Sequence, residues 1–295
     1  MYKLRDWIDI NKLDWNNLSS NKNAIFILEQ NQHRINWFGL SRNENAIYLL
    51  EKNLDKVDFD YGLSVNSNAI YLLEKYKSKI NWTLLCQNLS AILLIEKNIN
   101  RQKYDINWTW LSKNPNAIPL LEKNLDKIKW DWLSTNPNAI HLLEKNIDKI
   151  DWNLLSSNPN AIYLLEKNLD KIDWHRLSEN PNAIPLLEQN QDKIIWQWLS
   201  KNPNAIHIIE KNLDKISWLS LSENPCAISI LEKNQDKIHW GIFSSNISIF
   251  ELDYESMKKR CSIYKEELIQ VALHPSRIEK YLDQGINLAD LDNYI

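Results

Sequence analysis

The chain has 295 residues, of which 44% are hydrophobic and 25% are charged. This balance is typical of a folded protein and excludes a disordered one. The net charge of −3 at pH 7 argues against a nucleic-acid partner, because phosphate binding usually needs a positive excess. No apolar run approaches the roughly 18 residues of a membrane span, and the start has no apolar signal region. We expect no membrane contact and an intracellular location.

Residues 1–10 open the chain with Leu4, Trp7 and Ile8, which we expect to form an N-terminal cap over the repeats that follow.

Residues 11–250 are tandem repeats of about 22 residues. The segment SKNPNAIPLLEKNLDKIKWDWL (112–133) recurs as STNPNAIHLLEKNIDKIDWNLL (134–155), and eleven copies can be aligned on their first asparagine. The spacing becomes 23 once, near Asp60, and 26 once, through Arg101–Tyr104. A repeat of this length predicts one supersecondary unit per copy, stacked on its neighbours.

The first half of each repeat predicts a short helix. Ala117, Ile118, Leu120 and Leu121 have helical rather than strand spacing. Pro119 is compatible with this helix only in its first turn, so we expect Asn116 as the N-cap and a start near Ala117. We expect Asn124 to end the helix in a left-handed conformation.

The second half predicts a shorter helix that begins at a repeating tryptophan. The residue before that tryptophan is a capping type in eight repeats: Asp14, Asn36, Asp58, Asn81, Asn107, Asp151, Asp173 and Ser217. We expect the tryptophans to form a core ladder, with Phe59 in one gap. The ladder comprises Trp15, Trp37, Trp82, Trp108, Trp130, Trp152, Trp174, Trp196, Trp218 and Trp240.

Two helices this short bury a core only by stacking, so the pattern predicts an all-α fold, an α-solenoid of about eleven two-helix repeats. Adjacent helices roughly 8–10 Å apart would give a rod or superhelix on the order of 100 Å long. Leucine-rich repeats and a parallel β-helix are the rival folds, but both need strands that the pattern lacks.

After Phe250 the repeat pattern stops. Residues 254–272 predict a longer helix, and Ser276 and Glu279 have capping-box spacing at the start of another. We expect residues 251–295 to form a helical C-terminal cap, so that 1–295 is a single solenoid domain.

The motif N-P-N-A-I-x-L-L-E-K-N followed by D-W-x-x-L-S resembles the tandem repeats of uncharacterised proteins from amoeba-infecting giant DNA viruses. The tail H-P-S-R-I-E-K-Y-L-D-Q-G (274–285) is similar to one found in such proteins. The resemblance covers essentially the whole chain, although Lys22, Glu44, Ser67 and Leu89 replace the proline. It implies a viral origin, with residence in the host cytoplasm or the virion, and it transfers no active site.

Catalytic and metal-binding patterns are missing from the sequence. No two of the six histidines have the spacing of a zinc helix, and no phosphate-binding loop or nucleophile motif is present. Cys86, Cys226 and Cys261 lie far apart, which indicates neither a disulfide framework nor a metal knuckle. We expect no enzyme activity, no cofactor and no metal.

Variable positions within the constant frame are the candidate binding surface. The x of A-I-x-L-L lies opposite the buried face, and the second residue after each ladder tryptophan also varies. Aromatic side chains exposed there would suit an interface, although unselected surface variation or packing on a neighbouring repeat would also explain them. The candidates are Tyr48, Tyr71, Trp110, Trp132, His141, Tyr163 and His207.

Three functions are compatible with these features. A protein-interaction scaffold fits the extended surface and has a protein partner. A helical-repeat RNA reader would use stacking tyrosine and histidine, but the acidic balance opposes it. A structural component could self-associate, for example as a homodimer through one end of the solenoid.

Overall fold

A computed structural model describes residues 2–101 and 105–283. It divides the chain into two compact units, Leu4–Phe250 and a smaller unit that joins Met1–Lys3 to Glu251–Ile295. The sequence had suggested one domain, with the repeats ending at the same Phe250. Part of the expected C-terminal cap, residues 284–295, and most of the insertion at Arg101–Tyr104 lie outside the described residues.

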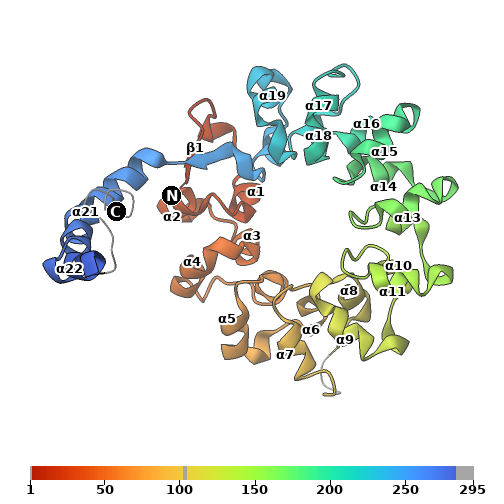
Figure 1. The fold of residues 1–295 in the computed structure, drawn as a ribbon, viewed down its shortest axis with the longest axis horizontal. Helices are drawn as coiled ribbons and strands as arrows, with labels where there is room; N and C mark the ends of the chain where they lie inside the picture. Colours follow the sequence, from red (N-terminus) through yellow and green to blue (C-terminus); the bar gives the residue numbers. More distant parts are fainter. Residues whose placement is uncertain (1, 102–104, 284–295) are drawn as a thin grey trace. The chain divides into compact units, whose positions relative to one another are not determined.

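The larger unit consists of short helices in a repeating order, which confirms the α-solenoid (Figure 1). One helix of each repeat begins at the ladder tryptophan and is here called the Trp helix. The Trp helices are α1 (Trp15–Ser20), α3 (Trp37–Arg42), α6 (Trp82–Leu85), α8 (Trp108–Lys113), α10 (Trp130–Leu133), α12 (Trp152–Leu155), α14 (Trp174–Glu179), α16 (Trp196–Leu199), α18 (Trp218–Leu221) and α20 (Trp240–Phe243). In the repeat with Phe59, a 3-10 turn, η4 (Leu63–Val65), occupies this place.

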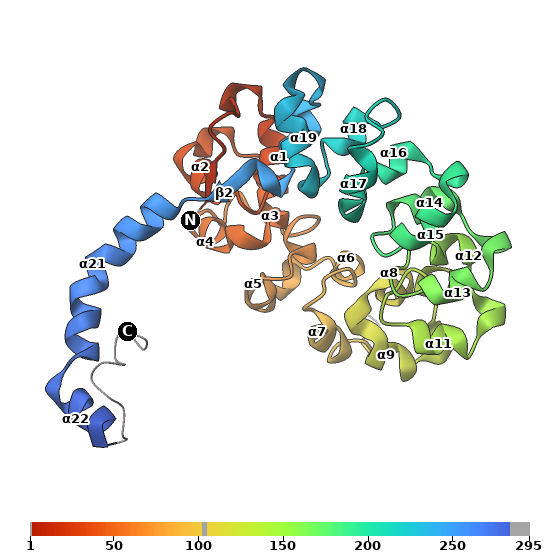
Figure 2. The same cartoon turned by 45° about the horizontal axis from the view of Figure 1, so that its top comes forward.

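The other helix begins at the isoleucine of A-I-x-L-L and is here called the Ile helix. The Ile helices are α2 (Ile25–Gln30), α4 (Ile47–Lys52), α5 (Ile70–Lys75), α7 (Ile92–Glu96), α9 (Ile118–Glu122), α11 (Ile140–Glu144), α13 (Ile162–Glu166), α15 (Ile184–Gln189), α17 (Ile206–Ile209) and α19 (Ile228–Lys233). Trp helices line the inner side of the unit and Ile helices the outer side (Figure 1, Figure 2).

The caps of the Trp helices follow the sequence prediction. Asp151, for example, accepts a hydrogen bond from the backbone N–H of Leu154 at 2.9 Å. His239 is not one of the eight capping residues expected from the sequence, but it also caps its helix, because its Nδ1 accepts from the N–H of Ile242 at 3.3 Å. Lys129 and Ile195 make no side-chain cap.

The caps of the Ile helices differ from the prediction. The helix near Ala117 begins at Ile118 with Pro119 in its first turn, as expected, but Asn116 is not its N-cap. Asn114 instead accepts from the N–H of Asn116 at 3.0 Å and caps a 3-10 turn, η6 (Pro115–Ala117). This turn lets the proline start a helical segment without breaking a hydrogen bond.

The end of the Ile helix was also predicted wrongly. Asn124 has φ −138° and ψ 52°, which is not left-handed. Its side-chain amide donates to the carbonyl of Leu120 at 2.8 Å. An orphan carbonyl at the helix end is therefore satisfied by an amide rather than by a change of backbone conformation. The equivalent asparagines Asn31, Asn53, Asn98, Asn146, Asn168, Asn190, Asn212 and Asn234 do the same.

A buried asparagine joins each repeat to the one before it. Asn43 donates from its side-chain amide to the carbonyls of Ser19 and Asn21, at 3.1 and 2.9 Å. Asn21, in the first repeat, donates in the same way to the carbonyls of Ser244 and Asn246 in the last, at 3.1 and 2.9 Å. The repeats of the larger unit therefore close into a ring, and the expected rod or superhelix is wrong.

The ring has the same asparagine junction at every step. Each of these side chains is almost completely buried, and each also accepts a hydrogen bond from the backbone two residues ahead. The amides belong to Asn21, Asn43, Asn66, Asn88, Asn114, Asn136, Asn158, Asn180, Asn202, Asn224 and Asn246.

A second buried row runs parallel to the asparagines. Ser156 donates to the carbonyl of Trp152 at 2.9 Å and accepts at 3.0 Å from the N–H of Asp173, the residue before the next ladder tryptophan. Across the closure, the N–H of Asp14 donates to Ser244 at 2.8 Å. The thiol of Cys86 replaces one serine of the row, accepting from the N–H of Asn107 at 3.3 Å. Burial raises the pKa of this thiol to about 11, so it stays protonated.

The first and last residues of the larger unit pack against each other where the ring closes. After α20, the chain makes a 3-10 turn, η14 (Ile247–Ile249), and enters a strand, β2 (Phe250–Leu252), instead of an Ile helix. The backbone N–H of Arg5 donates to the carbonyl of Ile249 at 3.0 Å, and its Nε donates to that of Ser248 at 2.8 Å. Trp7 stacks on Phe243 with ring centroids 5.9 Å apart. The expected N-terminal cap therefore packs on the last repeat.

The smaller unit has little packing of its own. Strand β1 (Tyr2–Leu4) pairs with β2 in a two-stranded sheet, and Lys3 lies 3.2 Å from a carboxylate oxygen of Glu251. Two helices follow, α21 (Tyr254–Ala272) and α22 (Pro275–Asp283). None of their described side chains belongs to the buried core. In the part of the chain that the structure describes, no helix is long and apolar enough to cross a bilayer.

Candidate interaction surface

The ladder tryptophans lie between the core and solvent. Trp15 and Trp82 are buried, at 9% and 7% exposure, and the other eight are partly buried and pack against the core. A cation from the following repeat covers most of these rings. Lys171, for example, has its Nζ 4.4 Å from the Trp152 ring centroid. A cation over an indole face is worth about 0.5–1 kcal/mol at exposed sites.

The cation row follows the ring around its closure. Its members stand three residues before a ladder position, which is a tryptophan in every case except Lys56, where it is Phe59. Lys12 lies over Trp240 at 4.8 Å across the junction of the two ends. The lysine that recurs in each K-I-x-W segment is the feature of the sequence that could have predicted this cation–tryptophan contact. The other pairs are Arg34–Trp15, Lys56–Trp37, Lys149–Trp130, Lys193–Trp174, Lys215–Trp196 and Lys237–Trp218.

The tyrosine and histidine candidates form an exposed row on the Ile helices, one to a repeat. The exposed fractions of Tyr48, Tyr71 and Tyr163 are 50%, 47% and 37%, and those of the His141 and His207 side chains are 48% and 51%. The row therefore lies on the outer side of the ring.

Each member of the row contacts a glutamate of the preceding repeat. His141 Nε2 lies 3.0 Å from Oε1 of Glu122, and His207 makes the same contact with Glu188. Tyr48 donates a hydrogen bond to Glu29 at 3.0 Å, and Tyr163 donates one to Glu144. Tyr71 is hydrogen-bonded to Glu51. These side chains add polar contacts between neighbouring repeats, so their presence has a structural explanation as well as a binding one.

Tyr71 and Tyr163, on the outer side of the ring, should ionise at a higher pH than an unperturbed tyrosine. The hydrogen bond to Glu144 raises the pKa of Tyr163 to about 12, and partial burial with the bond to Glu51 raises that of Tyr71 to about 12. The folded state therefore holds these protons more tightly than the unfolded state. The resulting stabilisation is present below pH ~10 and is lost as pH rises toward ~12.

An ultraviolet absorbance titration of tyrosinate checks this pH dependence. Tyr163→Phe should remove one tyrosine from the late phase and leave the amplitude near pH 10 unchanged. Loss of amplitude near pH 10 in the variant would contradict the shifted pKa.

The tryptophan candidates lie elsewhere, on the Trp helices. Trp110 packs against the core and lines a surface pocket of about 230 Å³ with Leu89 and Pro115. Nζ of Lys113 lies 5.7 Å from the Trp110 ring centroid and 5.8 Å from that of Trp132 in the next repeat. The structure thus brings Trp110 and Trp132 to one lysine, but it does not join them to the outer row.

A larger pocket, which sequence reasoning missed, includes Trp198, the residue equivalent to Trp110 four repeats further on. Its volume is about 490 Å³, and its lining includes Asp173, His175, Arg176, Pro181 and Trp198. Trp198, like Trp110, is the second residue after a ladder tryptophan. The available signal was His-Arg after Trp174, where other repeats carry uncharged or acidic pairs.

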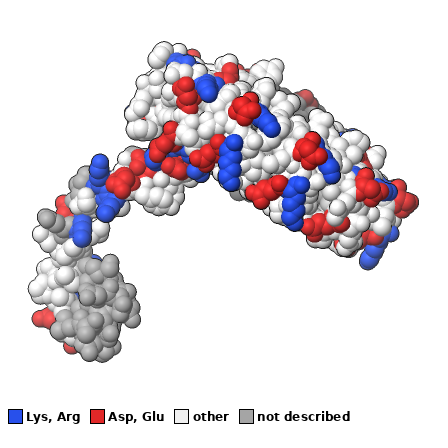
Figure 3. Space-filling model, turned by 90° about the horizontal axis from the view of Figure 1, so that it is seen from above, with Lys and Arg blue, Asp and Glu red and all other residues white. Residues whose placement is uncertain are grey.

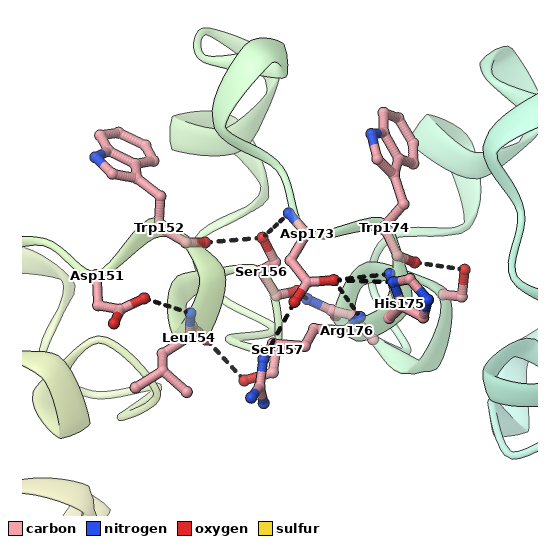
Figure 4. A network of polar contacts seen from close by, with 11 residues as sticks. Asp151, Trp152, Leu154, Ser156, Ser157, Asp173, Trp174, His175 and Arg176 are labelled. Atoms are coloured by element: carbon pink, nitrogen blue, oxygen red, sulfur yellow. Dashed lines mark hydrogen bonds and ion pairs between the residues drawn. The ribbon is translucent and has the colours of Figure 1, made fainter.

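Asp173 organises the charged side of this pocket. Its carboxylate accepts from the N–H of His175 at 2.9 Å and lies 3.5 Å from both His175 Nδ1 and Arg176 Nε (Figure 4). The rings of Trp152 and Trp174 point away from this network. The pocket therefore combines an indole, a proline and a guanidinium whose direction is fixed by a helix-capping aspartate.

Charges of both signs are interspersed over the repeats (Figure 3). On the face shown, lysine and arginine alternate with aspartate and glutamate, and neither sign forms a continuous tract. A phosphate backbone gains affinity from an unbroken positive surface, which this face does not offer.

Residues 90–260 match the family model described as "Periplasmic copper-binding protein (NosD)", which is more than half of the chain. By this match the chain belongs to the NosD family. No curated protein and no solved structure matches the chain.

The metal named in the NosD description does not fit the described residues. The matched segment consists mainly of repeats, and no constant position of the repeat is histidine, cysteine or methionine, the ligands that copper sites favour. No group of three or more histidine, cysteine, aspartate or glutamate side chains in residues 2–101 and 105–283 is arranged to hold a metal ion. We therefore assign no copper site to this NosD-family chain.

Proposed function

We propose that the chain is a non-enzymatic scaffold that binds a protein partner, and that the Trp helices carry the binding surface. The supporting observation is that the constant polar residues are used within the ring. The buried asparagine and serine rows satisfy backbone groups of neighbouring repeats, as Asn158 does for Ser134 and Asn136. The variable side chains then project from a frame that needs no rearrangement on binding, which lowers the entropy cost of association.

The pockets beside Trp110 and Trp198 favour this surface over the outer row. Each combines an indole with a proline and a cationic side chain, Lys113 in one and Arg176 in the other. Partly buried tryptophan and arginine are the residue types that dominate binding energy in protein interfaces. The outer tyrosines and histidines already have glutamate partners, so a ligand there would have to displace them.

The resemblance to giant-virus repeat proteins supports a place for this scaffold in the infected host cytoplasm or the virion. A structural, self-associating role and an RNA-binding role are the alternatives. The mixed charges of the repeats oppose the RNA alternative.

Affinity capture from the producing cell tests the proposal. The tagged chain is recovered with and without nuclease, and stoichiometric partners are identified by mass spectrometry. We expect a protein partner whose recovery is unchanged by nuclease. Trp110→Ala or Trp198→Ala should lower that recovery at least tenfold. Phe38→Ala is the matched control, because this 47% exposed aromatic on α3 lies outside both pockets. Unfolding curves of each variant exclude loss of fold.

Recovery that vanishes with nuclease would overturn the protein-partner proposal in favour of nucleic acid. Filter binding to single-stranded RNA at physiological salt would then test that alternative directly, and retention on the filter would support it.

A further inference from the structure

Helix α21 presents an apolar stripe whose described side chains are exposed. The stripe consists of Tyr254, Met257, Cys261, Tyr264, Leu268 and Val271, spaced alternately by three and four residues. The exposed fractions are 70% for Tyr254, 65% for Leu268, 52% for Tyr264 and Val271, and 38% for Met257, and Cys261 is also exposed.

This spacing is that of the two apolar positions, a and d, of a coiled-coil heptad. Tyr254, Cys261 and Leu268 take the a positions, and Met257, Tyr264 and Val271 take the d positions. A helix of 19 residues is about 28 Å long, and protein helices gain most of their stability from packing of an apolar face. The stripe therefore calls for a partner helix.

We propose that a second copy of the chain covers this stripe, and that the two α21 helices pair as an antiparallel coiled coil. In an antiparallel pair each a position meets a d position of the partner. One register aligns the whole stripe, and in it Tyr254 meets Val271, Met257 meets Leu268, and Cys261 meets Tyr264, each twice by symmetry. Every tyrosine then meets a smaller side chain, which is the large-with-small alternation that well-packed cores use.

A parallel pair packs the same residues less well. Each layer would then hold two copies of one side chain. Two tyrosines would meet in the layers of Tyr254 and Tyr264, and two small thiols in the layer of Cys261. Overpacked and underpacked layers side by side are unfavourable on both counts. The sizes of the side chains thus favour the antiparallel arrangement.

The charges beside the stripe agree with this register on one flank. Arg260 and Glu267 occupy g positions, which approach each other across an antiparallel pair, so the dimer gains two oppositely charged contacts. On the other flank Lys258 approaches Lys265, a like-charge contact whose long side chains extend into water. A parallel pair would instead bring Asp253 to Lys258 and Arg260 to Lys265. Each arrangement thus has one favourable and one unfavourable flank, and side-chain size decides between them.

Light scattering of the full chain over a range of concentrations tests the dimer. We expect a mass near twice 35.0 kDa that falls toward 35.0 kDa on dilution. Leu268→Asp, in the stripe, should raise the dissociation constant at least tenfold. Gln270→Asp, two residues away on the same helix but off the stripe, is the matched control and should leave it within about twofold. A monomer at all concentrations, or equal effects of the two variants, would overturn the proposal.

Disulfide trapping tests the antiparallel register. In a Cys226→Ser background, only Cys261 is exposed, because Cys86 is buried. Mild oxidation should then give no covalent dimer, since Cys261 faces Tyr264 of the partner. Mixing this chain with a second one that carries Cys226→Ser, Cys261→Ser and Tyr264→Cys should give a covalent heterodimer, because neither chain then holds two cysteines on α21, and the second chain oxidised alone should give none. A covalent dimer through Cys261 alone would overturn the antiparallel register in favour of the parallel one, and no trapping in any variant would overturn both.

Discussion

Replacing Asn158 by alanine is expected to lower the free energy of unfolding by about 2–4 kcal/mol. The side chain is fully buried and donates to the carbonyls of Ser134 and Asn136, both at 2.9 Å. It also accepts from the N–H of Asn160 at 3.0 Å. The substitution removes three hydrogen bonds and leaves buried backbone groups without a partner, which costs more than the bonds themselves contribute.

Denaturant unfolding measures this effect, with Asn160→Ala as the matched control. Asn160 is the next asparagine of the same repeat, but it is exposed and makes one side-chain bond, to the carbonyl of Pro137 at 2.9 Å. Its loss should cost less than about 1 kcal/mol, because water can replace it. Equal shifts of the two midpoints, at unchanged slope, would contradict a special role for the buried row.

Asn21→Ala should destabilise the protein as much as Asn158→Ala. Asn21 belongs to the first repeat, and in an open solenoid its amide would face solvent with no repeat before it. In the ring it donates to Ser244 and Asn246 of the last repeat and is 1% exposed. The expected loss is again about 2–4 kcal/mol.

The same unfolding experiment separates a ring from a rod. Asn23→Ala is the control, because Asn23 is less buried and makes one side-chain bond, to the carbonyl of Ile247 at 3.0 Å. A near-neutral Asn21→Ala beside a destabilising Asn158→Ala would mean that the first and last repeats are not joined in solution.

The repeat, its two helices and most helix starts could be predicted from the sequence, because they depend on local patterns. Asp151 and its equivalents are of residue types that cap helices, and they stand directly before the ladder tryptophan. Pro119 restricts where its own helix can begin. The conformation of Asn124 was predicted wrongly, because the same residue type can end a helix through its backbone or through its side-chain amide.

Ring closure could not be predicted, because it depends on the angle between neighbouring repeats. A small change in that angle separates a circle from an open superhelix, and no single residue encodes it. One indication was present in the sequence. Residues 9–13, D-I-N-K-L, are a degenerate copy of the N-x-D-K-I part of the motif before the first Trp helix, and the last repeat lacks that part after Asn246. The two partial copies meet at the closure, where Lys12 lies over Trp240, although no Ile helix is formed between them.

The candidate surface was only partly accessible to sequence reasoning. Exposure of Tyr48 and its row follows from helical periodicity and was predicted. Their glutamate partners come from the neighbouring repeat, so they depend on how the repeats stack. The pocket at Arg176 and Trp198 also lies between repeats, and its shape follows from stacking rather than from either residue alone.

The closed asparagine row changes how the fold can come apart. An open solenoid unravels from its ends, because a terminal repeat is held by one neighbour only. In the ring every repeat has two neighbours, and none can leave until two junctions have broken at once. Breaking one junction leaves every repeat attached to a neighbour, so the chain gains little conformational entropy from it. The molecule should therefore unfold slowly for its size, and amide hydrogens next to the closure should exchange no faster than those on the opposite side.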